Sequence, residues 1–129
     1  MRLATYTSAL ILALGLAGTA LGQQSPAEGN WACWANIDNT KSGLLTVYAN
    51  SYGYASRNYE SSASGAGNAQ LATDGVTFLD GNLVSGAGIT FAIASLDQVG
   101  QSVLTLYQPQ PDGAAAKPIL TCWELYSAV

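Results

Sequence analysis

Residues 89–126 read ITFAIASLDQVGQSVLTLYQPQPDGAAAKPILTCWELY, and this stretch decides the fold class. It holds three short apolar runs in which alternate side chains fall on opposite faces, as they do in β-strands. These runs are residues 89–96, 102–108 and 118–126. In the first and most apolar run, we expect one face to carry Ile89, Phe91 and Ile93. The residues between the runs are rich in Gly, Pro and Asp, which favour turns.

The same alternation continues toward the N-terminus. Further strands are expected at residues 31–37, 44–49, 55–62, 69–73 and 76–79. Asp74 and Gly75 suit a two-residue hairpin turn, because both central positions of a type I′ turn need positive φ. Asp80, Gly81 and Asn82 are expected to form the next turn, and residues 61–68 (SSASGAGN) a small-residue loop. After the first 22 residues, no segment shows a helical period.

Seven or eight short strands in about one hundred residues predict a single all-β domain. The expected architecture is an antiparallel two-sheet sandwich of immunoglobulin-like size, covering residues 31–129. A small closed β-barrel is the alternative. The chain lacks the Cys, Trp and Cys spacing of true immunoglobulin domains, so only the architecture is predicted. Residues 23–30 are polar and contain Pro26, and we expect them to form a flexible N-terminal lead.

The first 22 residues have the features of an export signal. Arg2 provides the positive start, residues 9–21 are apolar or small, and small residues at 19–22 offer a cleavage site. The apolar stretch is too short to span a bilayer as a helix, and no later segment is apolar enough. The remaining chain of about 107 residues is therefore expected to be periplasmic or secreted, without membrane insertion.

The two cysteines, Cys33 and Cys122, allow one pairing. Behind an export signal an even cysteine count predicts a disulfide, here one that joins the first structured segment to the last. It would close a loop of roughly 90 residues, for which chain entropy gives about 4–5 kcal/mol. A redox role would need a reactive pair such as Cys-x-x-Cys, which is absent, so we expect a structural staple.

The composition excludes several functional classes. The chain has no histidine, which excludes Ser-His-Asp and Cys-His catalysis, and it has too few ligands for a zinc site built on histidines or four cysteines. The formal net charge is −4, and without Arg2 three cations face eight acidic residues. Nucleic-acid binding and attraction to anionic lipid are therefore not expected. We expect no cofactor.

Three carboxylates precede a glycine at expected hairpins: Asp74, Asp80 and Asp112. Two carboxylates that face each other across a cleft can hydrolyse glycosides, but turn chemistry accounts for each of these residues. A calcium loop of the Asp-x-Asp-x-Asp-Gly type is also absent. We therefore expect a protein that is not an enzyme.

The aromatic residues suggest a binding surface. The candidate residues are Tyr48, Tyr52, Tyr54, Arg57 and Tyr59. If the stretch is extended, its tyrosines share a face that suits sugars or a protein partner. In the other interpretation residues 50–53 form a turn, and the tyrosines cover the edge of the sandwich. Trp31, Trp34 and Trp123 lie beside the cysteines, where they either pack on the disulfide or form a platform.

Several segments together resemble the small periplasmic curli-assembly proteins, the chaperone-like inhibitors of curli operons. The segments are the cysteine-bearing run 33–37, the glycine-led run 43–49, Tyr59 followed by SSASGAGNAQ, residues 75–78 (GVTF), and a final strand with Cys122. The resemblance covers most of the exported chain but rests on strand order and small residues. It implies an immunoglobulin-like sandwich that keeps amyloid subunits soluble. One branch carries a Cys-x-Cys pair, which this chain lacks, so a redox role is not implied.

An inhibitor of this kind would cap a growing β-edge, and its own edges must not polymerise. The expected strand at residues 55–62 is our candidate contact edge, with Arg57 and Glu60 as protecting charges and the tyrosines as anchors. The sequence thus predicts an exported, non-enzymatic binding module. Its expected partner is a protein, such as a curli subunit, or alternatively an extracellular glycan bound by a carbohydrate-binding or adhesive module.

Overall fold

The computed structural model describes residues 25–57 and 64–125. This part of the chain forms eight strands, one short α-helix and one 3-10 turn. The strands are β1 (Gly29–Ala35), β2 (Lys41–Tyr48), β3 (Ser51–Ser56), β4 (Gly65–Ala72), β5 (Gly75–Phe78), β6 (Phe91–Leu96), β7 (Ser102–Gln108) and β8 (Lys117–Glu124). The helix is α1 (Asn82–Ala87), and the 3-10 turn is η1 (Pro111–Gly113). Neither helix is long and apolar enough to cross a membrane.

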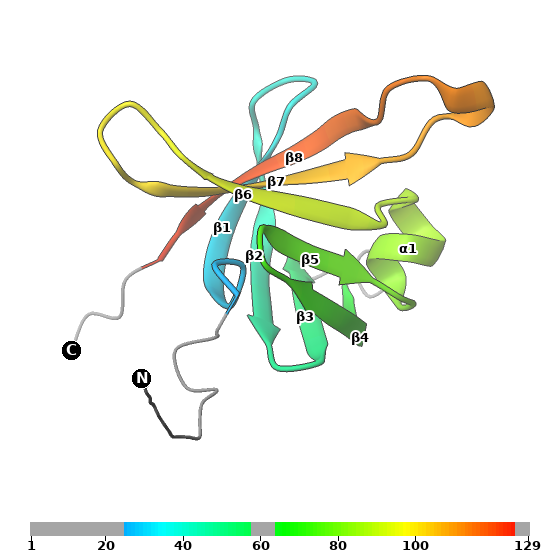
Figure 1. The fold of residues 1–129 in the computed structure, drawn as a ribbon, viewed down its shortest axis with the longest axis horizontal. Helices are drawn as coiled ribbons and strands as arrows, with labels where there is room; N and C mark the ends of the chain where they lie inside the picture. The colour runs from blue at the N-terminus through cyan, green and yellow to red at the C-terminus, as the bar shows by residue number, and fades with distance from the viewer. Residues whose placement is uncertain (1–24, 58–63, 126–129) are drawn as a thin grey trace, which may run out of the picture.

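The strands form one closed barrel in chain order (Figure 1). Each strand pairs antiparallel with the next, and β8 returns to pair with β1. The all-β prediction is confirmed, but the two-sheet sandwich is wrong and the alternative, a closed barrel, is correct. The alternation of side chains is the same in both architectures, because each strand has one buried face in either case. What differs is the pairing: here every strand pairs with its chain neighbours and β8 pairs with β1, whereas a sandwich divides its strands between two sheets.

The predicted disulfide is present at this closing pair of strands. Cys33 of β1 lies directly opposite Cys122 of β8, and the two sulfur atoms are bonded. Both side chains are fully buried in the barrel interior. The covalent bond therefore reinforces the one strand pairing that the chain order does not bring together locally.

The barrel interior is filled by alternate side chains of the strands. Its largest fully buried side chains are Trp31, Leu45, Ile89, Leu104, Leu106, Val47 and Val76. On β6 the buried side chain is that of Ala92, while Phe91 and Ile93 are only half-buried on the other face. Phe91 and Ile93 therefore share a face as predicted, but Ile89 does not join them, because it precedes β6 and is buried.

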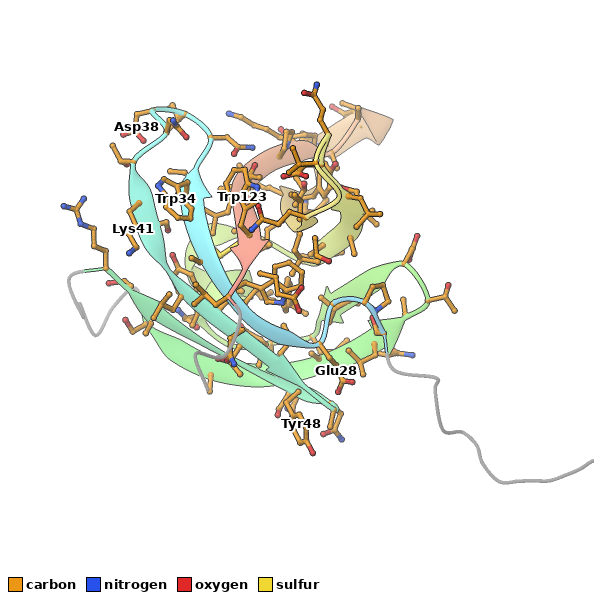
Figure 2. The ribbon with its side chains drawn as sticks, turned by 90° about the vertical axis from the view of Figure 1, so that its left-hand side faces the viewer. Glu28, Trp34, Asp38, Lys41, Tyr48 and Trp123 are labelled. Carbon is orange, nitrogen blue, oxygen red and sulfur yellow. A yellow bond between two sulfur atoms is a disulfide. The ribbon has the colours of Figure 1, made fainter. Side chains whose placement is uncertain are left out.

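One end of the barrel is closed by residues 25–28, which we call the strap. Ala27 is fully buried, and its carbonyl accepts a hydrogen bond of 2.9 Å from the indole nitrogen of Trp31. The hydroxyl of Ser25 donates to the carbonyl of Gly75 over 2.9 Å. Figure 2 shows Glu28 where the strap enters β1. The described part of the expected flexible lead is therefore packed against the barrel.

The opposite end is covered by α1, which follows the far end of β5 (Figure 1). The helix lies between Gly81 and Gly88, whose φ angles of 91° and 69° favour glycine. Leu83 is its buried side chain. Of the expected turn at residues 80–82, Asp80 and Gly81 form a bend, and Asn82 is the first residue of this helix. Six residues are too few to show a helical period in the sequence.

The remaining differences concern strand boundaries. The expected strand 55–62 is β3 at residues 51–56, and its end beyond Arg57 falls outside the described residues. β4 begins at Gly65, inside the expected loop. The β4–β5 turn lies one residue earlier than predicted, because Ala72 pairs with Gly75. Gly75 is required there for space, since a Cβ would clash with the carbonyl oxygen of Ala92.

Removing the disulfide tests how strongly the barrel depends on its closing seam. For the double variant Cys33→Ala/Cys122→Ala we expect a loss of about 4–5 kcal/mol in the free energy of unfolding, because the cysteines are 89 positions apart. Urea denaturation followed by tryptophan fluorescence measures this loss. Wild-type protein with reduced cysteines is the matched control and should show a similar loss. An unchanged midpoint in both samples would contradict the structural role.

Candidate functional site: a cavity at one end of the barrel

A cavity of about 470 Å³ lies at the α1 end of the barrel. It lies between α1, the start of β2, the end of β3 and the start of β8. We call it the end cavity. The strap fills the opposite end of the barrel, so the two ends differ in packing.

The floor of the end cavity is apolar. Leu83 of α1, Ile89 after the helix, and Leu120 of β8 line it and belong to the hydrophobic core. These three side chains come from segments that the barrel closure brings together. Each of the three side chains is at most 6% exposed, so the cavity reaches the edge of a packed core.

The rim of the end cavity is polar and carries positive charge. Hydroxyl groups line it at Ser42, Tyr54 and Ser56, and cations line it at Lys41 and Arg57. None of the described lining residues is acidic. The rim thus combines hydrogen-bonding groups with cations, next to the apolar floor.

A bulge in the β1–β2 ladder shapes this rim. The register shifts between Cys33 and Trp34, so that Cys33 pairs with Gly43 whereas Trp34 pairs with Lys41. Ser42 is left between these pairs, and its hydroxyl is hydrogen-bonded to that of Tyr54. Burial raises the pKa of Tyr54, against the opposing effect of the hydrogen bond with Ser42. The phenol is therefore neutral at physiological pH.

Tyr52 connects the barrel wall to α1. Its hydroxyl donates to the carbonyl of Asp80 over 2.7 Å and accepts from the backbone N–H of Leu83 over 3.1 Å. Burial raises the pKa of Tyr52, the Asp80 charge raises it further, and the hydrogen bond from Leu83 opposes both. One buried hydroxyl therefore holds the start of the helix that covers the end cavity.

Asp80 also ties this junction to β4. Its carboxylate accepts hydrogen bonds from the backbone N–H of Asn68 over 2.7 Å and from the Asn68 side chain over 2.9 Å. These bonds stabilise the charged form and lower the pKa of Asp80. Asp80 thus has a second role beyond the predicted turn: its contacts with Asn68 and Tyr52 hold the segment that leads into α1.

The predicted tyrosine face does not form. A tight turn at residues 49–50 reverses the chain, and Tyr48 is 72% exposed at the end of β2, as Figure 2 shows. Tyr52 and Tyr54 are 3% and 7% exposed and point into the barrel. Arg57 lies on the rim of the end cavity, and Tyr59 falls outside the described residues.

The candidate contact edge is also paired. Residues 51–54 of β3 pair with β2 on one side and with β4 on the other. This part of the strand therefore has no open backbone edge that could cap another sheet. The part of the expected edge at 58–62 lies outside the described residues.

The tryptophans divide between the two faces of the β1–β8 seam. Trp31 is in the core, whereas Trp34 and Trp123 lie side by side on the outer face, with ring centroids 5.5 Å apart in an edge-to-face arrangement (Figure 2). The Lys41 ammonium is 5.9 Å from the centroid of the Trp34 ring. The interpretation in which all three pack on the disulfide is therefore wrong for this outer pair.

Only part of the end cavity could be identified from the sequence. Tyr54 and Arg57 were candidates for a surface, and the structure brings them together with Lys41 and Ser42, which sequence reasoning missed. The α1 residues were missed as well. The one available signal was a short apolar segment bounded by Gly81 and Gly88, since glycines frequently flank helices.

Replacing Tyr52 with Phe tests the anchoring of α1. We expect a loss of about 1–3 kcal/mol in unfolding free energy, because two buried hydrogen bonds lose their partner. Amide hydrogen exchange should also become faster at Ser85 and Gly88, whose N–H groups bond within the helix region. Tyr48→Phe is the matched control and should stay within about 0.5 kcal/mol. Equal behaviour of the two variants would contradict this role for Tyr52.

The Asp80–Asn68 contact predicts a dependence of stability on pH. Because the folded pKa of Asp80 is lowered, its contribution is fully present above the ordinary value of 3.8 and is lost as pH falls through the folded pKa. Asp80→Asn should therefore be less stable than wild type at neutral pH, and the difference should shrink below pH 3.8. Urea midpoints measured across this range provide the test. A difference that stays constant with pH would contradict it.

Comparison of this chain with family models, with curated proteins and with solved structures finds no match. The resemblance to curli-assembly proteins therefore stays a prediction. The functional argument rests on the residues of the end cavity.

Proposed function

We propose that this protein is a non-catalytic, exported binding module that holds a small, largely apolar molecule in the end cavity. The observation that carries the proposal is the cavity of about 470 Å³ with its apolar floor. Sites for small molecules typically measure roughly 300–1,000 Å³ and combine apolar walls with a few polar groups. Eight-stranded barrels have an interior that is just wide enough for side chains or for one small ligand.

The contrast between the two ends of the barrel supports this proposal. The strap and Trp31 fill one end with side chains and hydrogen bonds. At the other end a helix covers part of the opening and leaves space over Leu83, Ile89 and Leu120. Burying apolar ligand surface there is favourable by about 25 cal/mol per Å².

The compartment forms part of the same proposal. The Cys33–Cys122 disulfide is the kind of bond that persists in oxidising compartments, which fits export by the predicted signal. A periplasmic or secreted barrel would meet its ligand outside the cytoplasm.

The two partners predicted from the sequence have less support. Residues 51–54 of β3 offer no open edge to cap a curli subunit, because they pair with β2 on one side and β4 on the other. A glycan could not stack on the predicted tyrosine face, because Tyr52 and Tyr54 are buried. Among the described residues, the pairs Trp34–Trp123 and Phe91–Tyr107 are aromatic surfaces that remain for a glycan.

A neutral fluorescent probe tests the end cavity directly. We expect N-phenyl-1-naphthylamine to gain fluorescence when titrated with the protein, because it moves from water to an apolar site. Gly86→Phe should weaken binding about tenfold or more, which corresponds to about 1.4 kcal/mol. Gly86 lines the cavity, and an added Cβ there has no neighbour within 4 Å.

Gly53→Phe provides the matched control. Gly53 does not line the cavity, and its added Cβ also has no neighbour within 4 Å. Both variants should keep the wild-type urea midpoint, so a difference in binding reports on the cavity. Absence of probe binding by the wild type, or binding unaffected by Gly86→Phe, would refute the proposal.

A further inference from the structure

We propose that the end cavity selects an amphiphile with one apolar chain and an anionic head group, a free monocarboxylate. The chain would lie on the floor at Leu83, Ile89 and Leu120, and the head would lie at the rim beside Arg57 and Lys41. This inference rests on the proposed function and adds to it the charge of the ligand.

The first argument is the distribution of charge. The chain has twice as many acidic as basic residues. Of the three cations in the described residues, Lys41 and Arg57 line the end cavity and Lys117 does not. None of the described lining residues is acidic. The two charged residues that line the cavity are therefore both cations in an acidic chain, which favours an anion. The Asp38 carboxylate beside them accepts hydrogen bonds from the N–H and hydroxyl of the lining residue Thr40.

The second argument is the way in which the two cations are held. The backbone N–H of Arg57 donates to the carbonyl of Ser42 over 2.8 Å, which fixes the base of the side chain at the rim. The side chain itself is exposed, and a guanidinium binds a carboxylate through two parallel hydrogen bonds. Lys41 lies over the Trp34 ring and adds charge from the outer side. Arg57 is thus the expected direct contact.

The third argument comes from the hydroxyl groups. Ser42 and Tyr54 share a hydrogen bond at the rim, and either oxygen can act as the donor. Two hydroxyls carry two protons and their mutual bond uses one, so the pair retains one proton to donate. An anionic acceptor satisfies this donor, whereas an ammonium head group does not.

The size of the cavity restricts the apolar part of the ligand. A space of about 470 Å³ lies in the lower part of the range for small-molecule sites. It suits one short chain. A two-chain membrane lipid would leave most of its apolar surface in water.

A displacement series tests the selectivity for charge. N-phenyl-1-naphthylamine bound to the full exported chain is displaced by decanoate, decanol or decyltrimethylammonium, each below its micelle concentration. We expect decanoate to bind about five- to tenfold more tightly than decanol, which matches one charge-assisted contact at an exposed rim. Decyltrimethylammonium should bind most weakly. The advantage of decanoate should also decrease with added salt, because the cations are near solvent.

Variants assign this selectivity to residues. Arg57→Gln should remove most of the preference for decanoate over decanol, and Arg57→Gln/Lys41→Gln should abolish this preference. Lys117→Gln removes the same charge away from the cavity and should keep the preference. A preference that survives in the double variant would overturn the inference.

The outcomes separate this inference from the proposed function. If decanol and decanoate displace the probe equally, the cavity binds apolar molecules and the anionic head group is refuted. Tightest binding by decyltrimethylammonium would refute it as well. If the probe does not bind at all, the proposed function fails, and the inference fails with it.

Discussion

The pairing of the first and last strands is the constraint on which the rest of the structure depends. β1 and β8 are far apart in the chain, and their ladder turns a row of hairpins into a closed barrel with an interior. Closure also removes the open edges through which β-sheets aggregate. The Cys33–Cys122 bond joins the middle of this seam across 89 positions, which reduces the entropy of the unfolded chain by a term worth about 4–5 kcal/mol.

The seam also determines where the candidate site lies. The bulge that follows Cys33 in the β1–β2 ladder leaves Ser42 facing Tyr54, and β8 brings Leu120 to the floor of the end cavity. The remaining wall is α1, whose start is held by the hydroxyl of Tyr52. The site is therefore assembled from segments that are distant in sequence and meet only because the barrel closes. None of these contacts has a local sequence motif.

This dependence explains how much the sequence could predict. The alternation of apolar and polar residues identified most of the strands, because it is a local pattern. The cysteine count identified the disulfide, because two cysteines allow only one pairing. The tyrosine face failed because the turn at residues 49–50 separates Tyr48 from Tyr52, so equal parity in sequence no longer means a shared face. To choose between a sandwich and a barrel, one must know which strands pair with each other, above all which strand pairs with β1. The alternation of side chains carries no information about pairing. The end cavity could not be predicted, because it requires the strand pairing, the turn positions and the place of α1 together.

An unfilled space in a domain of this size has an energetic consequence. Apolar residues that border a space have fewer contacts than a fully packed core would supply. The strap and Trp31 fill the opposite end of the barrel. At this end the helix between Gly81 and Gly88 leaves a space. The disulfide acts on the unfolded chain, so its stabilisation does not require that this end be packed. The cross-linked seam thus makes the stability of the closed barrel less dependent on how tightly this end is packed.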